Sequence, residues 1–190
     1  MVLLRYPGTK RPLVDSIGEE VLGALARHGD LLCEPFVGAG GFALTLAERA
    51  PDVRFLLYDA DPAIMALWNA VLRRDDAFLG AVTDYEPSVE TFYVYRDALR
   101  ARYWCSPLEA AFMKLVVHQT SFSGLGEMAG GPIGGRSQEG KKYTVGCRWD
   151  APRLIQKFER IADLMFGRTT VLCADFSQAF LQSSDCVFYV

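Results

Sequence analysis

The sequence has no apolar run long enough to cross a membrane. About 18 or more uninterrupted apolar residues are needed for a transmembrane helix, and here Arg, Asp or Pro interrupts each long apolar stretch, although 51% of the 190 residues are hydrophobic. The first ten residues, MVLLRYPGTK, also lack the apolar segment of a signal peptide. These absences predict a cytoplasmic protein with no membrane partner.

Paired cysteines and clustered histidines are missing too. The five cysteines lie far apart without a CxxC pair, and His28 and His118 are the only histidines. Disulfide frameworks and zinc sites both depend on closely spaced ligands. We therefore expect neither disulfides nor a metal site.

The chain lacks the net positive charge of many nucleic-acid-binding proteins, because its formal net charge is -3. That charge is unevenly spread. Seven basic and three acidic residues lie between Arg136 and Arg160, which gives this stretch a charge of +4. A basic patch on an acidic chain is typical of a protein that contacts phosphate with one face, although a solvated helix face and loop explains it equally well.

Short apolar runs alternate with helical patterns along much of the chain. The pattern predicts strands over Leu31–Phe36, Val53–Tyr58, Thr169–Cys173 and Cys186–Val190. It predicts helices over Pro12–Arg27, Phe42–Arg49, Pro62–Arg74, Val89–Tyr103, Pro107–Ser121, Pro152–Phe166 and Phe176–Gln182. Strands that alternate with helices predict an α/β fold with a mostly parallel, doubly wound sheet.

One interval, from Asp76 to Phe166, contains no convincing strand. We expect residues 76–166 to form a helical insertion, and residues 1–75 and 167–190 to form the α/β core. Ligands of doubly wound sheets bind at the carboxyl edge, so the insertion should cover the site. Its stretch Ser123–Gly146 holds eight glycines, which predicts either a mobile loop that orders on a partner or plain disorder.

A glycine-rich turn follows the first predicted strand, at Gly38-Ala39-Gly40-Gly41. Glycines let the backbone turn sharply and approach a ligand closely. Asp59 follows Gly40 by nineteen residues, close to the ~20-residue offset at which an acidic side chain meets an adenosine ribose. Together these features favour a nucleotide-like ligand over a structural turn. The loop reads GAGGFA rather than GxGxxG, which argues against a nucleotide-dependent dehydrogenase.

Six segments together resemble the Dam-type, D12 class DNA adenine-N6 methyltransferases, in that family's order and spacing. They are RYPGTK (Arg5–Lys10), EPFVGAGG (Glu34–Gly41), YDADPAIMALWN (Tyr58–Asn69), FYVYRDALR (Phe92–Arg100), TSFSGL (Thr120–Leu125) and VLCADFSQAF (Val171–Phe180). The resemblance covers nearly the whole chain. It implies a Rossmann-like methyltransferase sheet, S-adenosylmethionine as the cofactor and double-stranded DNA as the partner.

The resemblance also implies which residues contact the cofactor. Asp59 would bind the ribose, and Asp175 and Phe176 would hydrogen-bond to and stack on the adenine. On physical grounds alone Asp175 fits a helix N-cap equally well. The implied cofactor-binding set is Tyr6, Lys10, Glu34, Phe36, Gly38, Gly40, Asp59, Asp175 and Phe176.

The helical insertion resembles the target-recognition region of the same family. Arginine can bind guanine through two hydrogen bonds, and Lys or Arg neutralises phosphates. The implied DNA-binding set is Tyr95, Arg96, Ser121, Phe122, Ser123, Gly124, Arg136, Lys141, Lys142 and Arg148. The segment Ser121–Gly124 departs from the commoner Phe-Asn-Gly form, so the target sequence stays open.

The family's catalytic motif Asp-Pro-Pro-Tyr is absent from this sequence. In the family it directly follows the strand that corresponds to Cys186–Val190. We therefore expect an incomplete methyltransferase sheet, a chain that stops before its catalytic residues, and doubtful activity for this chain alone. The alternative is a non-catalytic cofactor- and DNA-binding module, or one subunit of a split enzyme whose C-terminal partner completes the sheet.

Overall fold

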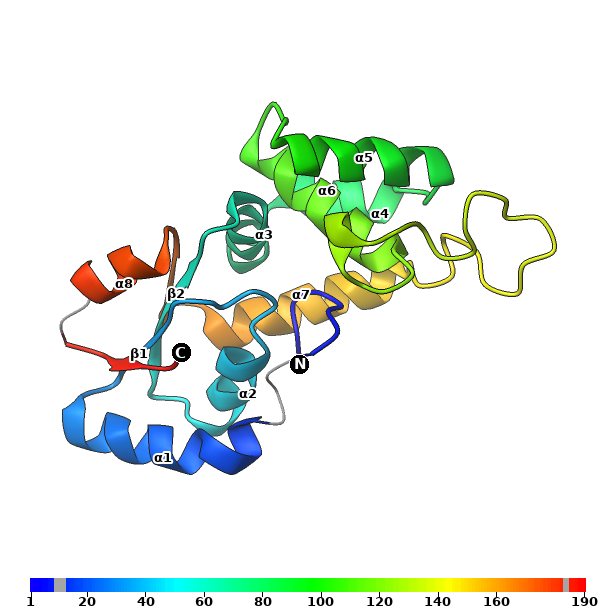
Figure 1. Cartoon of the computed structure of the whole chain (residues 1–190). Helices are drawn as coiled ribbons and strands as arrows, with labels where there is room; N and C mark the ends of the chain where they lie inside the picture. The colour runs from blue at the N-terminus through cyan, green and yellow to red at the C-terminus, as the bar shows by residue number, and fades with distance from the viewer. Residues whose placement is uncertain (9–12, 183–184) are drawn as a thin grey trace.

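The computed structural model describes residues 1–8, 13–182 and 185–190, which form a parallel sheet with helices on both faces (Figure 1). Helix α1 (Leu13–His28) leads into β1 (Leu31–Glu34), and α2 (Gly41–Arg49) leads into β2 (Arg54–Asp59) and α3 (Pro62–Leu72). At the other end of the chain lie β3 (Thr169–Cys173), α8 (Phe176–Gln182) and β4 (Val187–Phe188). The predicted α/β class with a parallel sheet is confirmed.

The strand order is β3-β2-β1-β4, and every neighbouring pair is parallel. Leu32 in β1 pairs with Phe55 on one side and Val187 on the other. From β1 the chain adds β2 and then β3 on one side of the sheet, and it returns to the other side of β1 with β4. In open α/β sheets, ligands bind outside the carboxyl ends of the strands at such a switch point. The carboxyl end of β1 is thus the expected ligand site.

The two faces of the sheet carry very different layers. Phe55 and Leu57 of β2 belong to the main core, which α2, α3 and α7 (Ala151–Met165) complete. Leu56 and Tyr58 alternate with them, as strand geometry requires, and pack toward Ala179 of α8. One face is therefore covered by a thick helical layer, whereas α8 forms the cover of the other among the described residues.

A second group of helices stacks beyond α3. It comprises α4 (Asp76–Asp84), α5 (Val89–Ala101) and α6 (Pro107–Thr120), followed by the short 3-10 helix η1 (Gly126–Met128). Helix α4 was not predicted, because only Phe78 and Val82 of its nine residues are buried and they make too weak a pattern. Its start is fixed by Asp75, whose side chain accepts from Phe78 N at 2.9 Å. The predicted elements begin and end within two residues of the observed ones.

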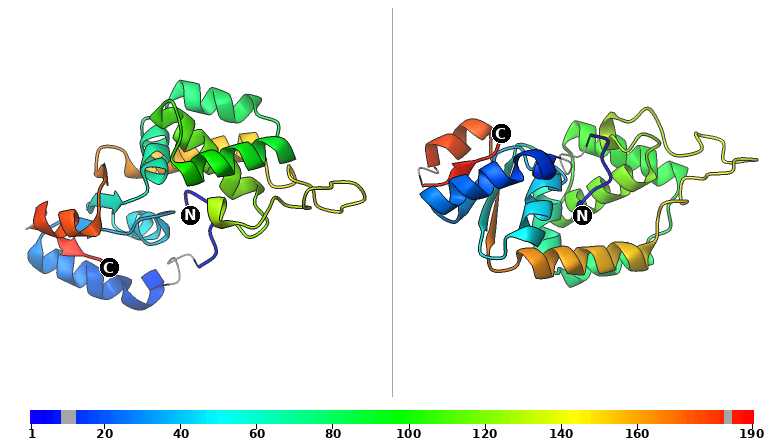
Figure 2. Two further views of the ribbon diagram at one scale, coloured as in Figure 1. Left: turned by 45° about the horizontal axis from the view of Figure 1, so that its top comes forward. Right: turned by 90° about the horizontal axis from the view of Figure 1, so that it is seen from below.

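Helix α7 joins the two parts of the molecule, running from the base of the glycine-rich stretch toward the sheet (Figure 2). Its residues Leu154, Phe158 and Ile161 belong to the same core as Phe55. The core therefore crosses the boundary proposed at residue 166, and the division into a core and an insertion stays a prediction.

The glycine-rich stretch Ser123–Gly146 follows an irregular path and projects from the helical group (Figure 1, yellow). Ser121 and Pro132 form an antiparallel bridge at its base. Further out, Gln138 Nε2 donates to Gly135 O at 2.7 Å, and Gln138 Oε1 accepts from Val145 N at 2.7 Å. These bonds give the stretch a defined conformation, while its ordering on a partner stays a prediction.

Across the described ranges, no helix is long and apolar enough to span a membrane. The same residues contain no group of three or more His, Cys, Asp or Glu side chains placed to hold a metal ion.

Candidate functional site

A cavity of about 380 Å³ opens at the carboxyl ends of β1 and β2. Tyr6, Phe36, Gly38 and Asp59, from three separate segments, are among its lining residues. Its volume falls in the range of roughly 300–1,000 Å³ typical of small-molecule sites. Four residues of the predicted cofactor set thus lie around one cavity at the switch point of the sheet. We call it the edge cavity.

Asp59 holds the loop after β1 in place. Its Oδ2 accepts from Gly38 N at 2.9 Å, and its Oδ1 accepts from Asp61 N at 2.9 Å. A carboxylate oxygen has two lone-pair positions, so each oxygen of Asp59 can accept one further hydrogen bond. Gly38 adopts a left-handed φ of 48° with open space where a side chain would begin. Backbone and carboxylate can therefore both contact a ligand here.

The neighbouring Gly40 has a packing role. A Cβ atom at Gly40 would lie 2.4 Å from Trp68 Cζ2, and the indole Nε1 of Trp68 donates to Gly38 O at 2.9 Å. Gly40 thus lets Trp68 of α3 dock against the loop. Glu34, another residue of the predicted set, is fully buried at the end of β1 and is not among the residues that line the edge cavity.

Asp175 and Phe176 lie at the start of α8, beside the edge cavity. The ring centroids of Phe176 and Phe36 lie 5.5 Å apart, and each residue is 46% exposed. Asp175 Oδ1 accepts from Ser177 N at 3.0 Å, and this hydrogen bond lowers the pKa of the Asp175 carboxyl. Asp175 thus makes the contact of a helix cap. Lys10, also predicted, lies outside the described residues.

A buried ion-pair cluster forms one wall of the edge cavity. Lys114 Nζ lies 2.5 Å from Asp61 Oδ2 and 2.7 Å from Glu127 Oε1, and the Lys114 side chain is 3% exposed. Burial alone would raise the pKa of the Asp61 carboxyl, but the charge and hydrogen bond of Lys114 outweigh it and lower that pKa. Sequence reasoning missed this cluster. The available signal was a single lysine in α6, a helix that is buried on nearly all sides.

His118 also lines the edge cavity. Its Nδ1 lies 3.1 Å from Gly124 O and 3.2 Å from Arg5 O. Burial first, and then the Lys114 charge, lower the pKa of the imidazole. With His118 neutral, the described lining contains one cation, Lys114. It contains three carboxylates, which belong to Asp59, Asp61 and Glu127. The edge cavity is therefore net negative and suits a cationic ligand.

Two residues of the predicted DNA-binding set pack within the chain, Ser121 fully and Tyr95 partly buried. Tyr95 stacks on Tyr85 with ring centroids 6.5 Å apart and meets Phe112 edge-on at 6.2 Å. Burial and then Glu109 raise the pKa of the Tyr95 hydroxyl. Both residues thus make contacts within the chain, and their assignment to DNA stays a prediction.

Arg96 and Arg136 both pack on Tyr93. Their guanidinium carbons lie 4.7 Å and 4.4 Å from the centre of its ring, a cation–π arrangement. Arg96 also donates to Asp97 Oδ1 through Nε and a terminal nitrogen, at 2.9 and 2.7 Å. The Tyr93 ring thus links α5 to the glycine-rich stretch.

Four other residues of the set come together around a second cavity of about 630 Å³. Phe122, Lys141, Lys142 and Arg148 line it, and the Phe122 side chain is 74% exposed. Ser123 and Gly124 follow Phe122 along the chain, and Ser123 Oγ accepts from Leu125 N at 3.3 Å. We call this cavity the loop cavity.

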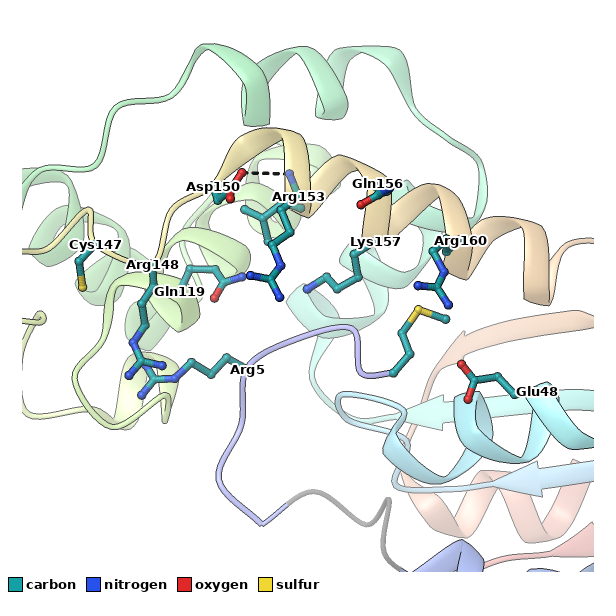
Figure 3. A pocket seen from close by; sticks show the side chains of 12 residues that line it. Arg5, Glu48, Gln119, Cys147, Arg148, Asp150, Arg153, Gln156, Lys157 and Arg160 are labelled. Carbon is teal, nitrogen blue, oxygen red and sulfur yellow. Dashed lines mark hydrogen bonds between the residues drawn. The ribbon is translucent and has the colours of Figure 1, made fainter.

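A third cavity, of about 720 Å³, lies between the N-terminal segment, α2 and α7 (Figure 3). We call it the basic cavity after its five cationic residues, which are Arg5, Arg148, Arg153, Lys157 and Arg160. Arg148 lines the loop cavity as well, so the two cavities are neighbours.

Known proteins similar to this chain are DNA adenine methylases. Over 126 residues it is 28% identical to the DNA adenine methylase of Escherichia coli (strain K12), covering 64% of this chain and 41% of that protein. The DNA adenine methylase of Serratia marcescens is 32% identical over 126 residues, which are 64% of this chain and 43% of that protein. The chain thus spans about two fifths of the length of the curated relatives it matches.

A family match extends well beyond these aligned regions. Residues 6–190 match the family described as D12 class N6 adenine-specific DNA methyltransferase. The matched range includes the loop after β1, Asp59, the glycine-rich stretch and β4. Because it covers nearly the whole sequence, this chain belongs to the D12 class N6 adenine-specific DNA methyltransferase family.

Proposed function

We propose that this protein is the cofactor- and DNA-binding part of a methyltransferase that transfers a methyl group from S-adenosylmethionine to adenine N6 in DNA. The observation that carries the proposal is the edge cavity, where Tyr6, Phe36, Gly38 and Asp59 meet at the switch point of a parallel sheet. Family membership supports the same reaction. Because the chain spans only part of its relatives, the activity of the whole enzyme is itself part of the proposal.

The residues around the edge cavity fit S-adenosylmethionine. The open side of Gly38 permits close backbone approach, and the second acceptor position on each Asp59 oxygen suits two ribose hydroxyls. The exposed rings of Phe36 and Phe176 offer apolar faces for an adenine. The net negative lining favours a sulfonium cation. When bound, the cofactor would supply a methyl group activated by that positive sulfur.

DNA is the proposed partner because basic and aromatic side chains gather around the loop cavity. Lys141, Lys142 and Arg148 surround the exposed Phe122 in the loop cavity. Lysine and arginine neutralise phosphates, and an aromatic ring offers a stacking face to a base. The target adenine must leave the duplex stack before its amino group can react.

A second candidate is a non-catalytic module that binds cofactor and DNA, or one subunit of a split methyltransferase. The sequence holds no Asp-Pro-Pro-Tyr motif, so methyl transfer has to be measured separately from cofactor binding. In the related family, this motif supplies acceptors for the target amino group. Both candidates require cofactor binding, and they differ in methyl transfer.

Calorimetry and a transfer assay test these candidates. We expect S-adenosylhomocysteine to bind the purified chain and NAD to give no heat. Binding of NAD without S-adenosylhomocysteine would refute both candidates. Transfer of tritium from labelled cofactor to plasmid DNA that lacks adenine methylation would establish the enzyme. Binding without transfer would favour the second candidate, and transfer restored by an added C-terminal partner would identify a split enzyme.

A further inference from the structure

The basic cavity concentrates positive charge from three separate parts of the chain. Arg5 comes from the N-terminal segment, Arg148 precedes α7, and Arg153, Lys157 and Arg160 lie on α7. The acidic residues in its described lining are Glu48 and Asp150. Figure 3 shows the arginines and the lysine directed toward a common space between α7 and the N-terminal segment.

These five cations lack acidic partners in the part of the chain that the structure describes. None of its ion pairs involves any of them. Asp150, an acidic residue of the lining, instead accepts from Arg153 N at 3.1 Å and caps α7. Burial and then the nearby Arg148 lower the pKa of Arg5. The positive charge of the cavity is therefore left for a bound anion to neutralise.

Internal contacts hold part of this charge in place. The guanidinium of Arg5 donates to Ser121 O at 2.7 Å and to Phe122 O at 2.9 Å. Lys157 Nζ donates to Leu3 O at 2.8 Å. A binding surface whose groups are already positioned loses less entropy when it engages a ligand.

The spacing on α7 indicates an extended ligand. Arg153, Lys157 and Arg160 occur at positions i, i+4 and i+7, which share one helix face. This stripe is about 10 Å long at 1.5 Å per residue. One strand of duplex DNA presents a phosphate about every 3.4 Å along the helix axis, so a stripe of this length can reach more than one successive phosphate. A small anion would occupy only one end of it.

The basic cavity and the edge cavity share a wall. Leu4 and Tyr6 line the edge cavity, whereas Arg5 between them lines the basic cavity. A strand held by the basic cavity would thus pass close to the proposed cofactor site. We infer that the basic cavity binds successive backbone phosphates of the DNA on which the proposed function acts, and the inference rests on that function.

Neutralising two exposed arginines of the stripe tests this inference. The double variant Arg153→Gln/Arg160→Gln removes two charges while glutamine keeps a good helix propensity. The control Arg27→Gln/Arg73→Gln makes the same charge change at exposed positions outside this cavity. Binding of a fluorescent unmethylated duplex is measured by anisotropy over a series of NaCl concentrations. Calorimetric titration with S-adenosylhomocysteine is run on all three proteins.

The slope of log K against log salt falls by about 0.9 for each phosphate that the protein no longer neutralises. We expect the stripe variant to reduce the slope by nearly two and to weaken binding at low salt by about tenfold or more, and the control to change affinity by less than about twofold. Cofactor-analogue binding should be equal in all three proteins. An unchanged slope, or an equal loss of affinity in the control, overturns the inference.

Two further arms identify the source of the phosphate and separate the two proposals. If inorganic pyrophosphate binds the wild-type protein and duplex DNA does not, the cavity serves a small anion and the DNA inference is wrong. Failure of the wild-type protein to bind S-adenosylhomocysteine refutes the proposed function through a different readout. In that case, a reduced salt slope in the stripe variant would still support a DNA-backbone site.

Discussion

The Lys114 ammonium donates to Asp61 Oδ2 across 2.5 Å, and this contact joins α6 to the start of α3. Asp61 Oδ1 in turn accepts from Ala63 N at 2.8 Å and caps α3. Glu127 binds the same ammonium at 2.7 Å. One buried cation therefore fixes three segments around the edge cavity.

We expect Lys114→Met to lower the free energy of unfolding by about 3 kcal/mol, because it leaves the carboxylates of Asp61 and Glu127 without the buried cation that pairs with them. This loss lies at the low end of what breaking a buried ion pair costs. The side chains of Asp61 and Glu127 retain 29% and 22% exposure, so water can partly hydrate them. Urea unfolding at pH 7 measures it. The triple variant that adds Asp61→Asn and Glu127→Gln serves as the control. If it is no more stable than Lys114→Met, the loss does not come from unpaired charge.

Local sequence patterns were sufficient to predict most of the sheet and its ligand edge. A short apolar run predicted β2, and the glycine turn with Asp59 predicted a ligand at the carboxyl end of β1. Gly38 and Asp59 both line the edge cavity, while their contact with a ligand and the identity of that ligand stay proposals.

The missed features depend on contacts between distant residues. The contact of Lys114 with Asp61 spans 53 positions, and Glu127 lies in a stretch with no periodic pattern. Residue type alone also could not show that the Tyr95 ring packs on Tyr85 and Phe112, and its assignment to DNA stays a prediction. Such choices are decided by tertiary packing.

Two glycines of one loop should respond differently to replacement by alanine. At Gly40, a left-handed φ of 69° and the contact with Trp68 predict a loss of about 2–4 kcal/mol in the free energy of unfolding. At Gly38, with a φ of 48° and open space around the added atom, we expect a loss of only about 1 kcal/mol but at least tenfold weaker binding of S-adenosylhomocysteine. Chemical unfolding and calorimetry separate the effects. Equal stability losses, or unchanged binding in Gly38→Ala, would contradict this.

Asp59→Ala should weaken S-adenosylhomocysteine binding by about tenfold or more. The change removes the proposed ribose acceptor and releases Gly38 N and Asp61 N, which the carboxylate now holds. Calorimetry measures the dissociation constant. Asp30→Ala is a matched control, because Asp30 is an exposed carboxylate paired with Arg54 near the amino end of β1. An affinity unchanged in Asp59→Ala would rule out the ribose role.

Lys157 gives the basic cavity a measurable effect of pH on stability. Burial lowers the pKa of its ammonium from 10.5 to about 8. Between pH 8 and 10.5 the unfolded chain thus binds a proton that the folded protein does not, so stability rises with pH in this window. The variant Lys157→Met lacks this pH-dependent contribution to stability, because methionine does not titrate. We expect the difference in unfolding free energy between the methionine variant and the wild type to shift by about 2 kcal/mol in favour of the wild type from pH 7 to pH 10.

Urea unfolding at both pH values measures that shift in a Cys147→Ser background, which removes the thiol that lines the same cavity. The charges of Arg153, Arg160 and Glu48 in the lining are present in both proteins and cancel in the comparison. Lys157→Arg is the control, because an arginine keeps its charge throughout this range and should show no such shift relative to the methionine variant. A constant difference between wild type and Lys157→Met across the range would mean that Lys157 titrates as an exposed lysine does, and that its ammonium is hydrated in the cavity rather than buried.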